Sequence, residues 1–240
     1  MHRIFRISLI LFIAGILICQ CASLQPREEA APSFDIVKRL FEQGNYAGVI
    51  HRADSLAGAD QESPLLYYYK GLAYLRKGSI ENALDAYHTA ADSQQNAYMD
   101  SAYAAELAQR AMRVYEQNKF EAVLSLAQQA ISIQETNTTA HYAKFMVEGR
   151  QLLEHGSKWE LWDAIIAFGN AAELKPENPI PHYYLARTYR KKDDQDFTNI
   201  IAEYEKSLDR NPPASIRKEI EERLEEARRR KKLYEDFWGQ

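Results

Sequence analysis

Helix-breaking residues are scarce in this chain of 240 residues, which holds only 10 glycines and 8 prolines. Few breakers among many good helix formers favour a mostly helical body. Apolar residues make up 46% of the chain and charged residues 27%, a mixture that can bury a core. The composition therefore predicts an all-α globular protein.

Cysteine is rarer still. Cys19 and Cys21 are the two cysteines of the chain, and both lie at the end of an N-terminal apolar run. The body that follows them therefore has no disulfide, even if it folds in an oxidising compartment.

Motifs that support chemistry are also missing. The six histidines are scattered without a His-x-x-x-His pair, so no zinc pattern is present. There is no glycine-rich phosphate loop and no Gly-x-Ser-x-Gly elbow. The acidic run 193–196 lacks the alternate spacing of a calcium loop and is interpreted as a solvated turn between helices. We therefore expect no catalytic residue, no metal, no cofactor and no small-molecule substrate.

The N-terminus has the features of a secretory signal. Arg3 and Arg6 give a charged start, and the segment Ile7 to Ile18 is almost wholly apolar. This run is shorter than the roughly 20 residues that span a bilayer. We expect a signal peptide over residues 1–21 and export to the periplasmic face of the cell envelope, with an uncleaved membrane anchor as the alternative.

The cysteines of this segment resemble the bacterial lipobox, whose cysteine is lipidated and becomes the first mature residue. The family pattern has a small residue before the cysteine, whereas Gln20 precedes Cys21 and Ile18 precedes Cys19. Cys21 is the favoured lipidation candidate and Cys19 the less favoured one, while cleavage after Ser23 fits nearly as well. Residues 22–32 are polar and serve as a tether, so the expected membrane contact is through a lipid or the signal anchor.

The charge balance bears on the partners. The chain holds 30 basic and 34 acidic residues, a formal net charge of −4. Removing residues 1–21 takes away Arg3 and Arg6 and lowers the net charge to about −6. This balance excludes a generic nucleic-acid binder and a polybasic membrane-surface binder.

The segment 64–97 has a repeat signature. Aromatic and small residues alternate at positions 4, 8, 11, 20, 24 and 27 of a 34-residue unit, occupied by Tyr67, Gly71, Tyr74, Ala83, Tyr87 and Ala90. Small residues let the two helices of a hairpin approach closely, and aromatics fill the gaps between hairpins. The segment resembles the tetratricopeptide repeat (TPR) family.

Further copies follow the same register. Residues 138–178 place Ala164, Phe168 and Ala171 at positions 20, 24 and 27, after about seven extra residues. Ser157 and Glu160 in this insertion form a capping box, and Trp159 and Trp162 there are either a second contact site or packing for the longer loop. We expect a right-handed superhelix of antiparallel hairpins over 33–214, with units near 30–63, 64–97, 104–137, 138–178 and 179–214 and an extension at 98–103 between two of them.

A last helix is predicted from Ser215 onward. Apolar residues follow one of its faces, and the other face is dense in Glu, Arg and Lys at spacings that suit ion pairs. Residues 215–240 are interpreted as the solvating cap that a repeat array needs at its end. A helix that pairs two copies in a coiled coil is the alternative.

The resemblance to the TPR family also implies a binding surface. In that family the first helices of successive hairpins line a concave groove through positions 2, 5, 9 and 12. The residues that match are Tyr68, Leu72, Leu75, Met112, Tyr115, Tyr142, Met146, Tyr183, Arg187 and Arg190, with Lys191 beside them. The expected groove has an apolar and aromatic floor and a basic end, and such residue types are enriched at protein interfaces.

Together these features predict a non-enzymatic scaffold of the bacterial cell envelope that holds a peptide or a helix of a protein partner. The length, the tether and the five repeats resemble the lipoproteins that assist the assembly of outer-membrane barrels or of pilus secretins. The alternative is an accessory regulator of a cell-wall enzyme, in which the groove contacts a folded domain.

Overall fold

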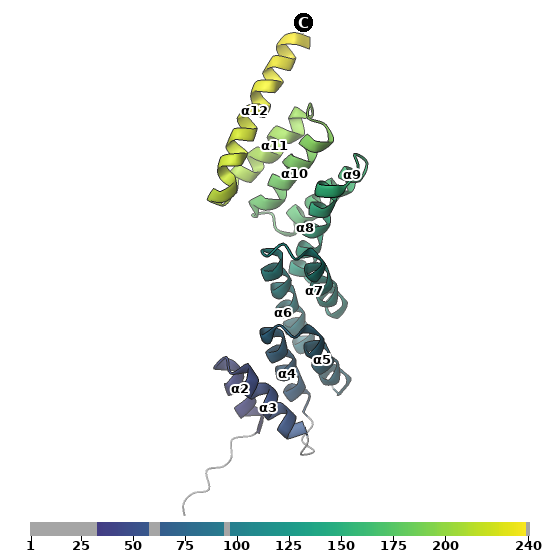
Figure 1. The fold of residues 1–240 in the computed structure, drawn as a ribbon, viewed down its shortest axis with the longest axis vertical. Coiled ribbons are helices and arrows are strands. Elements are labelled where there is room, and N and C mark those ends of the chain that lie inside the picture. The colour runs from purple at the N-terminus through teal and green to yellow at the C-terminus, as the bar shows by residue number, and fades with distance from the viewer. Residues whose placement is uncertain (1–32, 58–62, 94–96, 239–240) are drawn as a thin grey trace, which may run out of the picture. The chain divides into compact units, whose positions relative to one another are not determined.

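The computed structural model describes residues 33–57, 63–93 and 97–238, and these ranges form eleven helices and no strand (Figure 1). Consecutive helices pack side by side as hairpins joined by short loops, as in TPR solenoids. The prediction of an all-α hairpin fold is confirmed. The predicted signal over 1–21, the tether over 22–32, and Cys19 and Cys21 lie outside the described residues. The chain divides into two compact units, Met1–Gln94 and Gln95–Gln240.

The first unit holds two hairpins. They are built from α2 (Ser33–Glu42), α3 (Tyr46–Ala57), α4 (Pro64–Lys77) and α5 (Ile80–Ser93). Gly78 ends α4 in the left-handed region, with φ 87°, and its N–H donates to the Leu75 carbonyl. A residue with a Cβ is strained in that conformation, so glycine sets the turn between α4 and α5.

The core of the first unit is aliphatic at its centre and aromatic at its margin. Val37, Val49, Leu56, Leu66 and Ala73 are buried together. The Tyr69 ring lies 5.5 Å from the Phe34 ring and 5.4 Å from the Phe41 ring, both edge to face. These contacts tie α2 to α4, because the rings come from both helices.

The second unit holds three hairpins and a long terminal helix. Its elements are α6 (Ala97–Tyr115), α7 (Phe120–Ile133), α8 (Thr138–His155), α9 (Glu160–Leu174), α10 (Pro179–Lys192), α11 (Phe197–Asp209) and α12 (Ala214–Trp238). Side-chain oxygens of Asn137, Asn178 and Asp196 accept backbone N–H groups at the starts of α8, α10 and α11. Each of these caps satisfies a donor that has no partner within its helix.

Two local expectations have different outcomes. The capping box is confirmed, because the Ser157 N–H donates to Glu160 Oε2 at 2.7 Å and the Glu160 N–H donates to Ser157 Oγ at 3.5 Å. Residues 98–103, expected as an extension between units, instead form the first turns of α6. The physical reason is burial, since the Met99 and Tyr103 side chains are both buried.

Small residues set the distance between the helices of a hairpin. Ala83, Ala90, Ala111, Ala127, Ala164 and Ala171 are all buried at the predicted contact positions. The closest approach is at Gly149 of α8, where an added Cβ would lie 2.7 Å from the Phe168 ring of α9. The two helices can pack at this separation only because Gly149 has no side chain.

The terminal helix α12 changes character along its length. Ile220, Leu224 and Ala227 are buried against Tyr183 and Tyr204 of the preceding hairpin. From Arg228 onward the helix continues to Trp238, and its large apolar side chains are exposed. None of the described helices is both long enough and apolar enough to cross a membrane.

Candidate partner-binding surface

The groove residues predicted in the first unit are buried. Tyr68, Leu72 and Leu75 of α4 each keep less than a tenth of their surface exposed. Their side chains therefore contribute little accessible surface. Their contact with a partner stays a prediction.

Three predicted residues of the second unit are also buried, and their polar atoms have partners within the chain. The Tyr142 hydroxyl accepts a hydrogen bond from Asn178 Nδ2 at 3.1 Å. The Tyr183 hydroxyl donates to Glu219 Oε2 of α12 at 2.8 Å, and Met146 is fully buried. The apolar floor expected of an open groove is thus the core between successive hairpins, because the loop after α9 covers Tyr142 and α12 covers Tyr183.

An arginine that the sequence interpretation missed organises the neighbouring surface. The Arg150 guanidinium of α8 lies 4.6 Å from the Phe120 ring, 5.5 Å from the Tyr115 ring and 5.6 Å from the Tyr184 ring. Its Nη1 also donates to Asn118 Oδ1 at 3.0 Å. Cation–π contacts with three rings hold the charge of α8 against α6, α7 and α10. The missed signal was spacing: Arg150 follows Met146 by one helical turn, just outside the family positions.

Met112 and Tyr115, the remaining predicted residues of α6, are partly buried beside this arginine. Burial raises the pKa of Tyr115 to about 12, with a further contribution from Tyr184, while Arg150 acts in the opposite direction. The phenol is therefore a neutral, amphipathic group at neutral pH, suited to packing more than to acid–base chemistry.

The three basic residues predicted at one end of the groove line a cavity. Its volume is 360 Å³, and it is lined by Leu153, Glu154, Arg187, Arg190 and Lys191. Lys191 Nζ donates to the Leu153 carbonyl, and it lies 3.4 Å from the Glu154 carbonyl. Lys191 thus caps the C-terminal end of α8, where unpaired carbonyls and the helix dipole favour a cation. The lysine forms a wall of the cavity, because its ammonium is already occupied.

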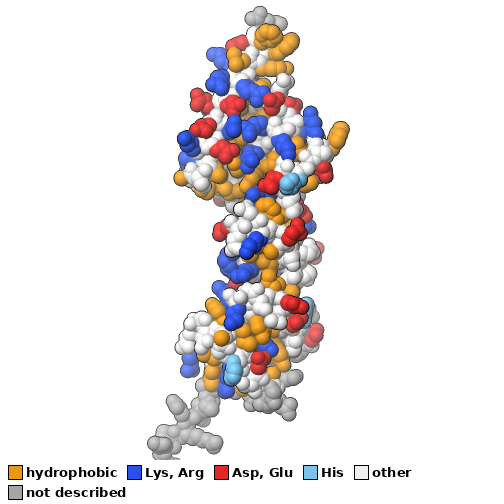
Figure 2. Space-filling model, in the orientation of Figure 1, with side chains coloured by type: hydrophobic (Ala, Val, Ile, Leu, Met, Phe, Trp, Pro, Cys, Tyr) orange, Lys and Arg blue, Asp and Glu red, His pale blue; other side chains and the backbone are white. Residues whose placement is uncertain are grey.

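Arg187 and Arg190 are partly exposed in this cavity. The Arg187 guanidinium lies 5.3 Å from the Tyr183 ring and 5.7 Å from the Tyr184 ring, and its Nη1 donates to the Tyr183 hydroxyl at 3.3 Å. Figure 2 shows Lys and Arg side chains interspersed with Asp and Glu over the region of α10 to α12. The structure therefore brings the three predicted basic residues together, with two arginines facing the open space.

In the described ranges, no group of three or more His, Cys, Asp or Glu side chains is placed to bind a metal ion. The acidic run at 193–196 lies between α10 and α11, as expected of a turn. Asp196 caps α11, and Asp194 pairs with Arg230 of α12 at 2.6 Å. These carboxylates thus have structural roles.

Comparisons with known proteins give no family by sequence: no protein-family model and no curated protein matches the chain. Among solved structures, the chain is similar to YrrB, described as a TPR protein with an unusual peptide-binding site, at 19% identity and a TM-score of 0.48 over 80% of this chain and 91% of that one. It is similar to MamA at 17% identity and a TM-score of 0.48, over 73% of this chain and 94% of that one. It is also similar to the C-terminal part of a TPR repeat-containing protein from Cytophaga hutchinsonii, at 17% identity and a TM-score of 0.40, over 74% and 78%. At these identities and scores no site is transferred, and the hairpin assignment rests on the packing of the chain's own helices.

Proposed function

We propose that this protein is a non-enzymatic scaffold that binds an extended peptide or a helix of a partner protein on the surface of α8 and α10. The observation that carries the proposal is the 360 Å³ cavity in which Arg187 and Arg190 converge. A guanidinium offers five donors in a rigid plane, so a pair of them suits a carboxylate or successive backbone carbonyls of a ligand. An acidic or polar segment of the partner is the expected ligand of this cavity.

The surroundings of Arg187 support a binding role. Its guanidinium makes cation–π contacts with the Tyr183 and Tyr184 rings, and the Tyr183 hydroxyl accepts a hydrogen bond from its Nη1. An arginine held in this way loses less conformational entropy when a partner binds than a freely rotating one. Arginine and tyrosine together are also the residue types that contribute most binding energy at protein interfaces.

The proposal places the scaffold at the periplasmic face of the cell envelope, attached to a membrane through residues 22–32 and a lipid on Cys21. Support comes from the sequence, where Arg3 and Arg6 precede the apolar run and the cysteines follow it. A tether of this kind would hold the helical body close to envelope complexes whose assembly it assists.

The partner site is tested by cross-linking in the native envelope followed by affinity capture. The double variant Arg187→Glu with Arg190→Glu should lose the partner that the wild type captures, because two cations become two anions in the cavity. The matched control is Lys38→Glu with Arg39→Glu, which makes the same charge change on two exposed residues of α2. Capture by the cavity variant at the wild-type level would show that the basic cavity is not the site.

The anchor is tested by metabolic labelling with radioactive palmitate. Label should appear on the wild-type protein and vanish from Cys21→Ala, whereas Cys19→Ala should keep it. Label that persists in Cys21→Ala would remove the assignment of Cys21.

A further inference from the structure

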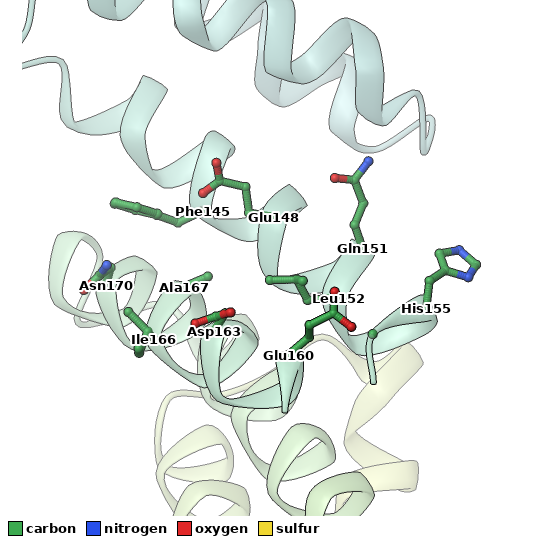
Figure 3. A pocket seen from close by; sticks show the side chains of 11 residues that line it. Phe145, Glu148, Gln151, Leu152, His155, Glu160, Asp163, Ile166, Ala167 and Asn170 are labelled. Carbon is green, nitrogen blue, oxygen red and sulfur yellow. The ribbon is translucent and has the colours of Figure 1, made fainter. Parts of the chain in front are cut away.

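A second surface of the molecule, separate from the basic cavity, is a cleft between α8 and α9. The cleft has a volume of 610 Å³ and an apolar floor made by Phe145, Leu152, Ile166 and Ala167. Figure 3 shows Phe145, Glu148 and Gln151 projecting from one helix and Asp163, Ile166 and Asn170 from its neighbour. Ile166 is more than half exposed, and the exposed Trp159 and Trp162 precede it at i−7 and i−4. Lys192 Nζ lies 4.1 Å from the Trp162 ring, so Trp159 and Ile166 are the more open apolar side chains of this face, a pattern typical of a contact site.

The margin of the cleft is acidic. Glu148, Glu160 and Asp163 line it, together with Gln151 and Asn170, and its lining includes no Lys or Arg. Glu148 has Lys144 of its own helix at 3.7 Å, and Glu160 is the carboxylate of the capping box. Hydrogen bonds from Ser157 lower the pKa of Glu160, so this group stays ionised near neutral pH. The cleft thus fits a segment that combines large apolar side chains with basic ones.

The last turns of α12 are such a segment. Five consecutive basic residues, 228–232, precede the exposed side chains of Leu233, Tyr234, Phe237 and Trp238, and Glu235 and Asp236 lie among the latter. The Tyr234 ring lies 6.1 Å from the Phe197 ring of α11, so Leu233, Phe237 and Trp238 are the apolar side chains left for a partner. Within the basic run, Arg228 pairs with Glu205, Arg230 with Asp194 and Lys231 with Glu235. Arg229 and Lys232 are exposed and have no carboxylate partner among the described residues. We call residues 228–238 the α12 tip.

One stripe of the α12 tip combines a basic side chain with apolar ones. Arg229, Leu233 and Phe237 are spaced at i, i+4 and i+8, so they lie on the same side of the helix. A cation therefore precedes two large apolar side chains along one line, with the Asp236 carboxylate beside Phe237 on the same side of the helix. The cleft offers the complement, with carboxylates beside an apolar floor.

We propose that the α12 tip of one molecule docks in the α8–α9 cleft of a second copy of this chain. Leu233 and Phe237 pack on the apolar floor, and Arg229 and Lys232 face the carboxylates of Glu148 and Asp163. Because the tip and the cleft are different surfaces, each docked molecule still presents one of each. The association is therefore head to tail, and it extends into chains of copies unless the rotation between copies closes a ring.

Analytical ultracentrifugation of the full chain, in density-matched detergent and at low salt, tests this contact. The wild type should show a sedimentation coefficient that rises with concentration. The tip variant is Leu233→Ser with Phe237→Ser, which removes the apolar contacts. The cleft variant is Glu148→Lys with Asp163→Lys, which reverses the charge of the margin. Each variant alone should sediment as a monomer at every concentration.

Mixing the two variants is the decisive arm. The cleft variant keeps an intact tip and the tip variant keeps an intact cleft, so one contact per pair can form. We expect the mixture to give a one-to-one complex that grows no further. Two controls should associate as the wild type does: Glu221→Lys with Glu225→Lys, which makes the same charge change on exposed residues of α12, and Leu65→Ser, which removes an exposed apolar side chain of α4.

Other outcomes overturn the proposal. A wild type that stays monomeric at all concentrations has no such contact. Association that disappears in the tip variant but persists in the cleft variant shows that α12 tips pair with one another. Both results leave the partner site at Arg187 and Arg190 untouched, because neither variant changes that cavity.

Discussion

The two halves of α12 have the same amphipathic periodicity but different surroundings. In the first half, Ile220, Leu224 and Ala227 are buried against α10 and α11. In the second half, Leu233 is 63% exposed and Phe237 is 74% exposed. An apolar stripe therefore indicates which side of a helix is suited to packing. It does not indicate whether the packing surface belongs to the same chain. Five predictions test this difference between the two halves.

The largest effect is expected from deleting a side chain in the buried half. Leu224→Ala should lower the free energy of unfolding by about 2–4 kcal/mol, because it removes buried methyl groups and leaves a cavity. The matched change in the exposed half, Leu233→Ala, should stay within about 0.5 kcal/mol. Urea denaturation of dilute protein measures both. Equal losses at the two positions would show that the tip is covered in solution even in the monomer.

A smaller effect is expected at the hairpin on which the buried half rests. In α11, Glu203 Oε2 lies 2.7 Å from His182 Nδ1, and Glu203 Oε1 lies 2.6 Å from Lys206 Nζ. Replacing Glu203 by Gln should cost about 2 kcal/mol near neutral pH, since a mostly buried charge-assisted bond is lost. Urea denaturation measures the loss, and a Glu203→Gln protein as stable as the wild type would contradict the assigned role.

The contribution of Glu203 to the free energy of unfolding also depends on pH. Burial alone would raise the pKa of Glu203, but hydrogen bonds from His182 and Lys206 outweigh it and hold the pKa below the usual value of 4.5. A carboxyl whose pKa is lower in the folded than in the unfolded protein stabilises the fold at pH values above its unfolded-state pKa. This stabilisation is lost as the pH falls through its folded-state pKa. The stability gap between wild type and Glu203→Gln should therefore narrow below about pH 4.5. A gap that stays constant on acidification would be inconsistent with this linkage.

The contact between the buried half of α12 and α10 contributes less to the free energy of unfolding. Tyr183→Phe removes the hydroxyl that donates to Glu219 of α12 at 2.8 Å. The same hydroxyl accepts from Arg187 Nη1 at 3.3 Å, so we expect a loss of about 1–1.5 kcal/mol, most of it from the shorter bond to Glu219. The double variant with Glu219→Gln should lose little more than Tyr183→Phe alone, because the two groups share the bond. Additive losses would show that they act independently.

The smallest effect belongs to the exposed half. Lys231 lies 3.8 Å from Glu235, one turn further along α12, and both side chains are largely exposed. Lys231→Ala should change the free energy of unfolding by about 0.5 kcal/mol or less, because solvent screens such pairs. A loss comparable with that of Glu203→Gln would mean that the tip is folded against the body.

The sequence predicts the hairpins because their signals are local. Small residues such as Ala83 and Ala164 mark the close contacts, and both are fully buried. Asn137, Asn178 and Asp196 start helices through bonds within three residues of themselves. Only the start of α6 was misjudged, because Tyr103 is held in place by tertiary burial, which a repeat register does not encode.

The candidate site was harder to predict because exposure depends on distant segments. Tyr183 occupies a family groove position, but a helix that begins thirty-one residues later covers it. Lys191 is predicted at the basic end of the groove, and its ammonium is used by the carbonyls of α8. Arg150 went unnoticed because its importance comes from rings of three different helices. A single sequence shows none of these long-range contacts.

The end of α12 has a consequence for the electric field around the protein. Residues 228–238 span about 16 Å at the usual rise, and contacts to the body end at Tyr234, whose ring lies 6.1 Å from the Phe197 ring of α11. In physiological salt the screening length is about 8 Å, so distant charges of the body contribute little at the end of the tip. A molecule with a formal net charge of −4 therefore has an end whose own eleven residues are net positive, with five basic residues against Glu235 and Asp236. An approaching surface responds to this end before it senses the total charge, so encounter rates should depend on ionic strength at the tip.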